Sequence, residues 1–133
     1  MTARRETEIR VHIPAGKDGP DVLALLADHQ LSTLTRSCCA DREGLLLLLT
    51  TIRPEEVQQV LEAAGYHCHA HPVVLIGPTT YRLGVAARLL AELGQQGVDI
   101  RYSYLSSIAP ERCFVVVETS NDERAMEIVA AAA

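Results

Sequence analysis

The stretch that decides the fold runs from Val73 to Val117 and reads VVLIGPTTYRLGVAARLLAELGQQGVDIRYSYLSSIAPERCFVVV. It opens with a short β-branched run that predicts a buried strand, and the glycine, proline and threonine that follow predict a loop. Apolar residues at helical spacing over 85–93 predict a helix, which Gly94 and Gly97 are expected to end. Alternation over Val98–Tyr104 and the apolar run Cys113–Val117 predict two further strands. The predicted order is strand, helix, strand, strand.

The first half of the chain gives a similar order. Glu8–Ile13 alternates between apolar and polar residues, which predicts a strand with one wet face. Asp18 is placed to cap a helix that carries a proline in its first turn. We predict strands over Leu31–Ser37 and Leu45–Thr51, joined by an extended turn over residues 37–44, and a second helix that begins at Pro54.

The two halves align with each other as a diverged duplication. Three pairs of segments correspond, with offsets that grow only at loops: Ile9–Pro14 with Val73–Pro78, Leu26–Leu31 with Leu93–Val98, and Leu45–Thr51 with Phe114–Ser120. Each half reads β-α-β-β-α, and Tyr66–Ala70 completes the first. The predicted class is α+β, with two ferredoxin-like βαββαβ plaits in tandem, each an antiparallel sheet with helices on one face. The predicted modules are residues 7–71 and 72–133.

The second half lacks a predicted final strand, because a helix over Asp122–Ala133 is the last element of the sequence. Either the second half is truncated, or we expect that strand to come from the Tyr66–Ile76 connection or from a partner chain. An exposed sheet edge is a surface that proteins usually cover. The pattern therefore favours a homodimer formed by extension of the sheet.

A family resemblance rests on these same residues. The segment GVAARLLAEL (residues 84–93), the glycine turn after it and VDIRY (residues 98–102) resemble the ACT domain. ACT domains are amino-acid-sensing regulatory modules of aspartate kinases and other metabolic enzymes, and they also occur as free-standing tandem proteins. The resemblance is close in the second half and weaker in the first. It implies a small regulatory protein that binds a free amino acid or related metabolite at the interface of tandem modules, and that modulates a metabolic enzyme or its own oligomerisation.

The resemblance also implies a ligand site, held by the loop after the first strand and by the start of the second. In this chain the residues are Gly77, Pro78, Thr79, Thr80, Tyr81, Arg82, Leu83, Gly84, Val98, Asp99 and Ile100. An amino-acid carboxylate suits backbone N–H groups at a helix N-terminus, while Asp99 suits the ammonium and Arg82 an acidic group. The loop departs from the family in lacking x-Pro-Gly, and Tyr81 is bulky enough to fill the site. The alternative is a β-α turn that binds no ligand.

Three histidines form a second constellation. His67, His69 and His71 alternate along a predicted strand, so they share one face and Cys68 takes the other. Imidazoles could ligate zinc, nickel or copper, but residues two apart on a strand are separated by about 6.5–7 Å, so a straight strand does not make the three converge. We expect a wet strand and no metal or cofactor. A metal carrier and a pH-sensitive interface are the alternatives.

Composition excludes several classes of function. The formal net charge is −5, whereas nucleic-acid footprints are basic. An RNA-recognition plait would also need exposed aromatic residues beyond Tyr102 and Tyr104. The longest apolar run, Leu45–Leu49, is far shorter than a membrane span, and no signal peptide precedes it, so we expect a cytoplasmic protein with no membrane partner.

No catalytic arrangement stands out either. The sequence has no Ser-His-Asp order, phosphate loop or pair of catalytic carboxylates, so we do not expect an enzyme. The four cysteines, at positions 38, 39, 68 and 113, form no C-x-x-C motif and are expected to be free thiols. The alternative to the ligand-binding regulator is an ACT-like module that binds no ligand and serves in dimerisation or protein docking.

Overall fold

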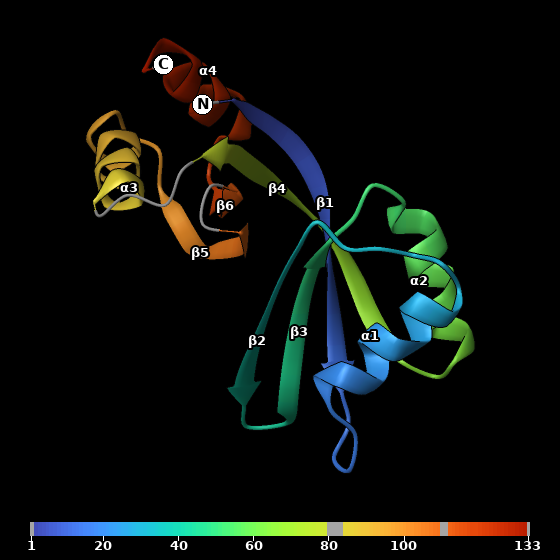
Figure 1. Cartoon of the computed structure of the whole chain (residues 1–133). Helices are drawn as coiled ribbons and strands as arrows, with labels where there is room; N and C mark the ends of the chain where they lie inside the picture. Colours follow the sequence, from blue (N-terminus) through green and yellow to red (C-terminus); the bar gives the residue numbers. More distant parts are fainter. Residues whose placement is uncertain (1, 80–83, 110–111, 133) are drawn as a thin grey trace. The chain divides into compact units, whose positions relative to one another are not determined.

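The computed structural model describes residues 2–79, 84–109 and 112–132. Six strands and four helices follow one another in it (Figure 1). In chain order they are β1 (Ala3–Ile13), α1 (Gly19–Asp28), β2 (Thr35–Asp41), β3 (Gly44–Thr50), α2 (Pro54–Ala63), β4 (His67–Thr79), α3 (Val85–Gln95), β5 (Ile100–Ala109), β6 (Arg112–Thr119) and α4 (Asp122–Ala131). The α+β class and the ferredoxin-like plaits predicted from the sequence are confirmed.

The chain divides into two compact units. The first unit is Thr7–His71, and the second unit is Pro72–Ala133 together with Met1–Glu6. The hydrogen-bonded strand order is β2-β3-β1-β4-β6-β5. Strands β1 and β4 are long because each belongs to one unit at its start and to the other at its end. Each unit therefore contains four strands and two helices. The first unit has them in the chain order of a ferredoxin-like plait, whereas the strand that completes the second unit, the start of β1, comes first in the chain.

The first unit has a one-sided core. Strand β3 pairs antiparallel with both β1 and β2, and alternate residues of β1 (Ile9, Val11 and Ile13) are at most 2% exposed. They pack in one cluster with Val22 and Leu26 of α1 and with buried residues of α2. The predicted cap of α1 is confirmed: the Asp18 carboxylate accepts a hydrogen bond from the backbone N–H of Asp21, and the reverse bond completes a capping box.

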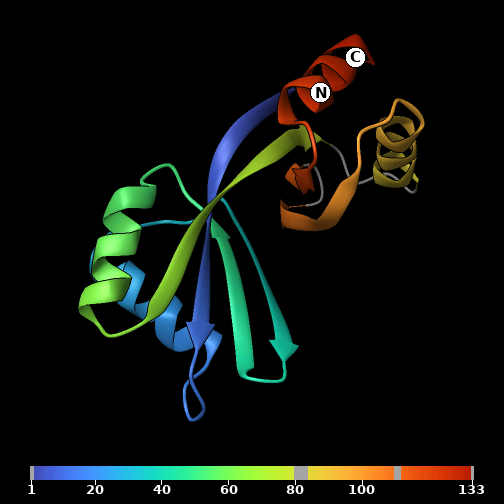
Figure 2. The ribbon, with the colours of Figure 1, turned by 180° about the vertical axis from the view of Figure 1, so that it is seen from behind.

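The second unit obtains its fourth strand from the beginning of the chain. Figure 2 shows the N-terminal part of β1 and the C-terminal part of β4 running beside each other. The Gly77 N–H donates to the Thr2 carbonyl oxygen at 2.9 Å, and the Thr2 hydroxyl donates to the Gly77 carbonyl oxygen at 3.0 Å. Ala3 packs against the core of this unit. The N-terminus was not among the sources considered from the sequence, because residues 3–6 carry no apolar strand pattern.

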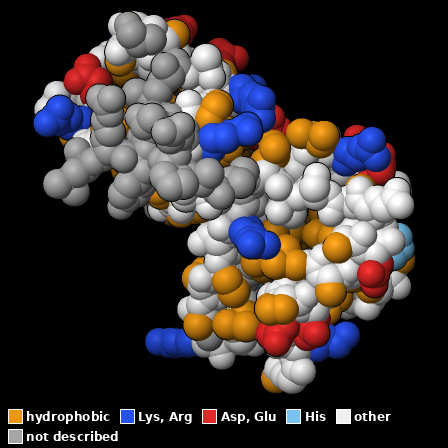
Figure 3. Space-filling model, in the orientation of Figure 1, with side chains coloured by type: hydrophobic (Ala, Val, Ile, Leu, Met, Phe, Trp, Pro, Cys, Tyr) orange, Lys and Arg blue, Asp and Glu red, His pale blue; other side chains and the backbone are white. Residues whose placement is uncertain are grey.

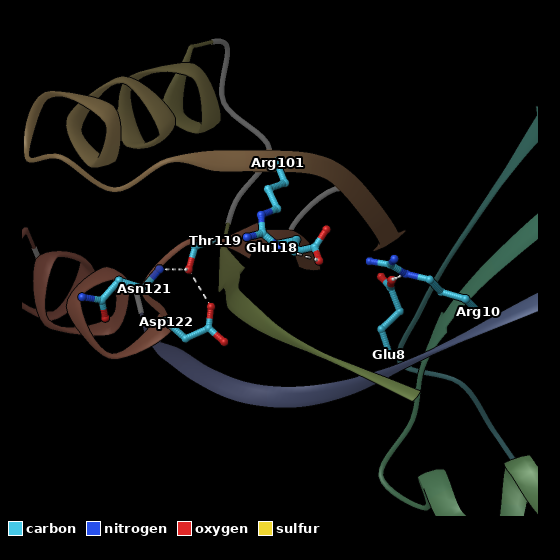
Figure 4. Close-up of polar contacts among 7 residues, drawn as sticks. All are labelled: Glu8, Arg10, Arg101, Glu118, Thr119, Asn121 and Asp122. Atoms are coloured by element: carbon cyan, nitrogen blue, oxygen red, sulfur yellow. Dashed lines mark hydrogen bonds and ion pairs between the residues drawn. The ribbon is translucent and has the colours of Figure 1, made fainter. Parts of the chain in front are cut away.

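A capped helix closes the second unit. Its core joins β4 and β6 to the buried faces of α3 and α4. The Asn121 side chain accepts a hydrogen bond from the Arg124 N–H at the start of α4. Beside this cap, the Thr119 hydroxyl donates to the Asp122 carboxylate and accepts from the Asn121 N–H (Figure 4). These bonds fix the turn between β6 and α4, where a side-chain oxygen satisfies an otherwise unpaired N–H.

Two sequence predictions at the β2–β3 hairpin were wrong. Strand β2 begins at Thr35 rather than Leu31, because residues 31–34 complete the turn after α1. The segment predicted as an extended turn is strand as far as Asp41, and Cys38 pairs with Leu47. Only two residues separate the strands, and Gly44 takes φ +136° as β3 begins, a conformation that glycine adopts readily.

The four cysteines are free, as predicted: Cys38 and Cys39 are exposed, and Cys68 and Cys113 are buried. Burial, together with the Glu62 carboxylate that accepts from its thiol, raises the pKa of Cys68 above its ordinary value of 9.0. On the face drawn in Figure 3, positive and negative side chains are interspersed among hydrophobic ones. None of the helices in the described ranges has the length and apolar character needed to cross a membrane.

Candidate functional site

One half of the predicted ligand site lies where β4 ends and α3 begins. Gly77 and Pro78 are the last residues of β4 before Thr79. Gly84 stands at the N-cap of α3 with φ +83°, and no side chain caps this helix, whereas side chains cap α1 and α4. We call this the glycine corner. Residues Thr80, Tyr81, Arg82 and Leu83 lie outside the described part of the chain.

The other half lies where α3 ends and β5 begins. Val98 is 2% exposed, and its N–H donates to the Leu93 carbonyl oxygen, which closes the turn after the helix. The Asp99 N–H donates to the Ser120 hydroxyl at 3.0 Å, and the Asp99 carbonyl accepts from the Ser120 N–H at 2.9 Å. Asp99 itself is exposed, and Ile100 is the first residue of β5. The backbone of this aspartate corner is therefore held while its carboxylate faces solvent.

Within the second unit the two corners lie at opposite ends of the sheet. The distance between the two corners can be counted along β6, because both β4 and β5 pair with it antiparallel. Thr79 of β4 pairs with Cys113, and Ile100 of β5 pairs with Thr119. Six residues of a strand separate these two positions, which is about 20 Å. One free amino acid is too short to contact both corners of the same unit.

The first unit repeats the aspartate corner with different chemistry. The Thr51 hydroxyl donates to the Ser32 carbonyl oxygen at 3.1 Å, which ties the turn after α1 to the turn before α2. By the internal alignment, Ser32 corresponds to Asp99, and Thr51 corresponds to Ser120. The turn is preserved in both units, but a neutral serine stands at the position of the aspartate. The structure therefore places a negatively charged acceptor at this turn in the second unit and a neutral hydroxyl at its equivalent in the first.

Histidines gather on the open face of the first unit, where His12 lies beside two of the residues singled out in the sequence, His67 and His69. The ring centroid of His12 lies 5.5 Å from that of His67 and 5.5 Å from that of His69, and the rings of His67 and His69 are 4.8 Å apart. His12 comes from β1, the strand beside β4. As the side chains stand, no three His, Cys, Asp or Glu residues among those described are arranged to hold a metal ion.

Sequence reasoning did not group His12 with the histidines of β4, although the signal was present. The alternation of Glu8–Ile13 puts His12 on the polar face of its strand, and a βαββαβ plait places its first and fourth strands next to each other. Combining the two would have put His12 beside the histidines of β4. The prediction considered one strand at a time and so took His71 as the third member.

Comparisons with known proteins agree with this architecture. No model of a protein family matches the sequence, and no curated protein sequence matches it. Among solved structures, the chain is similar to protein BT0572 from Bacteroides thetaiotaomicron, with a TM-score of 0.84 and 18% identity over 98% of this chain and 90% of that one. It is also similar to the ligand-free regulatory subunit of aspartate kinase from Thermus thermophilus, with a TM-score of 0.69 and 16% identity over 99% and 97% of the two chains.

A third similar structure is that of aspartokinase alpha and beta subunits, with a TM-score of 0.68 and 16% identity over 99% of this chain and 97% of that one. At this identity the likeness defines the fold. The fold is the one found in aspartate kinase regulatory subunits, which is the ACT-type plait that the sequence resemblance implied. The Thermus thermophilus neighbour is itself a regulatory subunit.

Proposed function

We propose that this chain is a non-catalytic regulatory module that binds a free amino acid or a related metabolite. The observation that carries the proposal is the match of fold along nearly the whole of both chains to a regulatory subunit of aspartate kinase. The sequence resemblance of residues 84–93 and 98–102 to ACT domains supports it independently. Binding would change the oligomeric state of the module or its affinity for a metabolic enzyme, as thermodynamic linkage requires.

The two corners offer the chemistry that a zwitterion needs. At the glycine corner, the first backbone N–H groups of α3 are not occupied by a side-chain cap, and a helix N-terminus stabilises a carboxylate. At the aspartate corner, the exposed Asp99 carboxylate suits an ammonium group. We therefore assign the ligand carboxylate to the glycine corner and the ligand ammonium to the aspartate corner.

Because the corners of one unit are about 20 Å apart, we propose that a bound ligand contacts the corners of two copies. Strand β5 is at one end of the strand order, so it has a single neighbour, and it carries the half-exposed Leu105. If β5 pairs antiparallel with its copy across a two-fold axis, the start of one β5 meets the end of the other. Asp99 of one copy then lies at the same end of the joined sheet as the glycine corner of the other.

A thermal-shift screen against the twenty amino acids, with a chelator present, tests this function. A ligand at 100 times its Kd adds about 2.7 kcal/mol to the free energy of unfolding, which raises the Tm of so small a protein by roughly ten degrees. The Asp99→Ala variant should lose most of the shift. The matched control, Asp28→Ala, removes an exposed aspartate at the end of α1 and should retain it.

Light scattering completes the test, because the proposed site requires two copies. A ligand-binding protein that stays monomeric with ligand bound would contradict the two-copy site. Absence of a shift with every amino acid at millimolar concentration would contradict the sensor and favour the module that serves only in dimerisation or docking.

A further inference from the structure

We propose that His12, His67 and His69 form a binding site for a late first-row transition-metal cation such as Zn²⁺ or Ni²⁺. The site lies on the open face of the first unit and is independent of the amino-acid site proposed above. Its three imidazoles come from two adjacent strands, β1 and β4. Imidazole nitrogen favours these cations, whereas Mg²⁺ and Ca²⁺ favour oxygen ligands.

The spacing of the rings carries the proposal. A zinc–nitrogen bond is about 2.0–2.1 Å, and the centre of an imidazole ring lies roughly 1.1 Å beyond its nitrogen. Two imidazoles on a tetrahedral ion therefore have centroids about 5 Å apart. The three distances in the cluster are 4.8, 5.5 and 5.5 Å. In their present conformers, the three rings are therefore separated by about the distance that a shared ion requires.

Only the orientation of the rings has to change. The side chains as they stand do not form a metal site, and the ring planes meet at 36°, 86° and 89°. Rotation of an imidazole about its Cβ–Cγ bond has a broad, shallow profile. His67 and His69 are exposed, so their rings can turn toward a common point without displacing core residues.

The surroundings leave room for the ion and for one more ligand. The histidines line a hollow of about 490 Å³ that is also bordered by Pro14, Leu45 and Glu43. Three protein ligands leave one tetrahedral position open, as in metal sites that bind water or an exogenous ligand.

Isothermal titration of the chelator-treated protein with Zn²⁺, Ni²⁺ and Mg²⁺ tests the proposal. We expect one Zn²⁺ or Ni²⁺ per chain and no binding of Mg²⁺. His12→Ala, His67→Ala and His69→Ala should each weaken the affinity by at least 10- to 100-fold, since loss of mere outer partners of metal ligands already has that effect. His29→Ala is the matched control, because His29 is an exposed histidine of the same unit. The affinity of this variant for Zn²⁺ and Ni²⁺ should equal that of the wild-type protein.

The His71→Ala variant distinguishes this site from the one suggested by the sequence alone, which consists of His67, His69 and His71. If His71→Ala abolishes binding while His12→Ala does not, the ligands belong to β4 alone and the proposal is wrong. If the wild-type protein binds no Zn²⁺ or Ni²⁺ at millimolar concentration, the proposal is also wrong. The visible spectrum of bound Co²⁺ provides a second readout. If a variant keeps the native circular dichroism but loses the Co²⁺ spectrum, the replaced residue coordinates the metal and is not needed for folding.

Discussion

Deletion of residues 2–6 should destabilise the second unit and leave the first unit stable. These residues supply the second unit with its fourth strand. The deletion removes both hydrogen bonds between Thr2 and Gly77, the packing of Ala3 on the core and the ion pair of Arg5 with Asp122 at 3.6 Å. All of these contacts are made within the second unit.

The magnitude follows from the hydrogen bonds. Each one stabilises the fold by about 0.5–1.5 kcal/mol net, so the two together contribute about 1–3 kcal/mol. The Arg5 ion pair is half-exposed on the arginine side and adds at most about 1 kcal/mol. The hydrogen-bond loss of about 1–3 kcal/mol by itself corresponds to a roughly 5- to 150-fold increase in the population of opened molecules.

Hydrogen–deuterium exchange measures this loss separately in each unit. Amides of β4 near Gly77 and amides of β6 should exchange about 5- to 150-fold faster in the deletion variant, while those of β3 in the first unit should keep their protection. The control is full-length Arg4→Ala, which removes only an exposed side chain and its ion pair with Glu6. Unchanged protection of β4 and β6 in the deletion variant would refute the assignment of residues 2–6 to this sheet.

Two further predictions concern single residues. Because burial raises the pKa of Cys68 above 9.0, iodoacetamide at pH 8 should modify the exposed Cys38–Cys39 pair well before Cys68. Equal rates of alkylation, measured by mass spectrometry, would contradict this expectation. The stability that the protonated Cys68 contributes should be lost as the pH rises above 9. Gly44→Ala should lower the free energy of unfolding by about 1–3 kcal/mol, since its Cβ would lie 2.9 Å from the Ile13 carbonyl oxygen at φ +136°. Gly19→Ala, which meets nothing within 4 Å, should stay within about 0.5 kcal/mol of wild type in urea denaturation.

Much of the fold could be predicted from local pattern. Three features were predicted correctly because each depends only on residues that are close together in the sequence. They are the alternation of Glu8–Ile13, the cap at Asp18 and the helical spacing over 85–93. The boundaries of β2 could not be read in the same way. The sequence Ser37–Gly44 is rich in polar and small residues, and its strand character depends on pairing with the apolar β3.

Long-range pairing accounts for the rest. Thr2 and Gly77 are 75 positions apart, and nothing in residues 2–6 shows that they join a sheet whose other strands come from the far end of the chain. His12 was missed for the same reason, since its neighbours on β4 are brought to it by topology alone. The sequence predicted the residues of both ligand corners, but their placement at opposite ends of one sheet depends on the registers of β4 and β5 against β6.

The two units show which part of the aspartate corner holds the turn and which part does not. Each unit ties the turn after its first helix to the turn before its second with a hydroxyl group, Ser120 in one and Thr51 in the other. The hydroxyl accepts a hydrogen bond in the second unit and donates one in the first, so the tie survives even a reversal of its direction. The charged side chain has no such equivalent, because Asp99 corresponds to Ser32. The carboxylate is therefore not required for the tie, which leaves it available for the ligand role that we propose for Asp99.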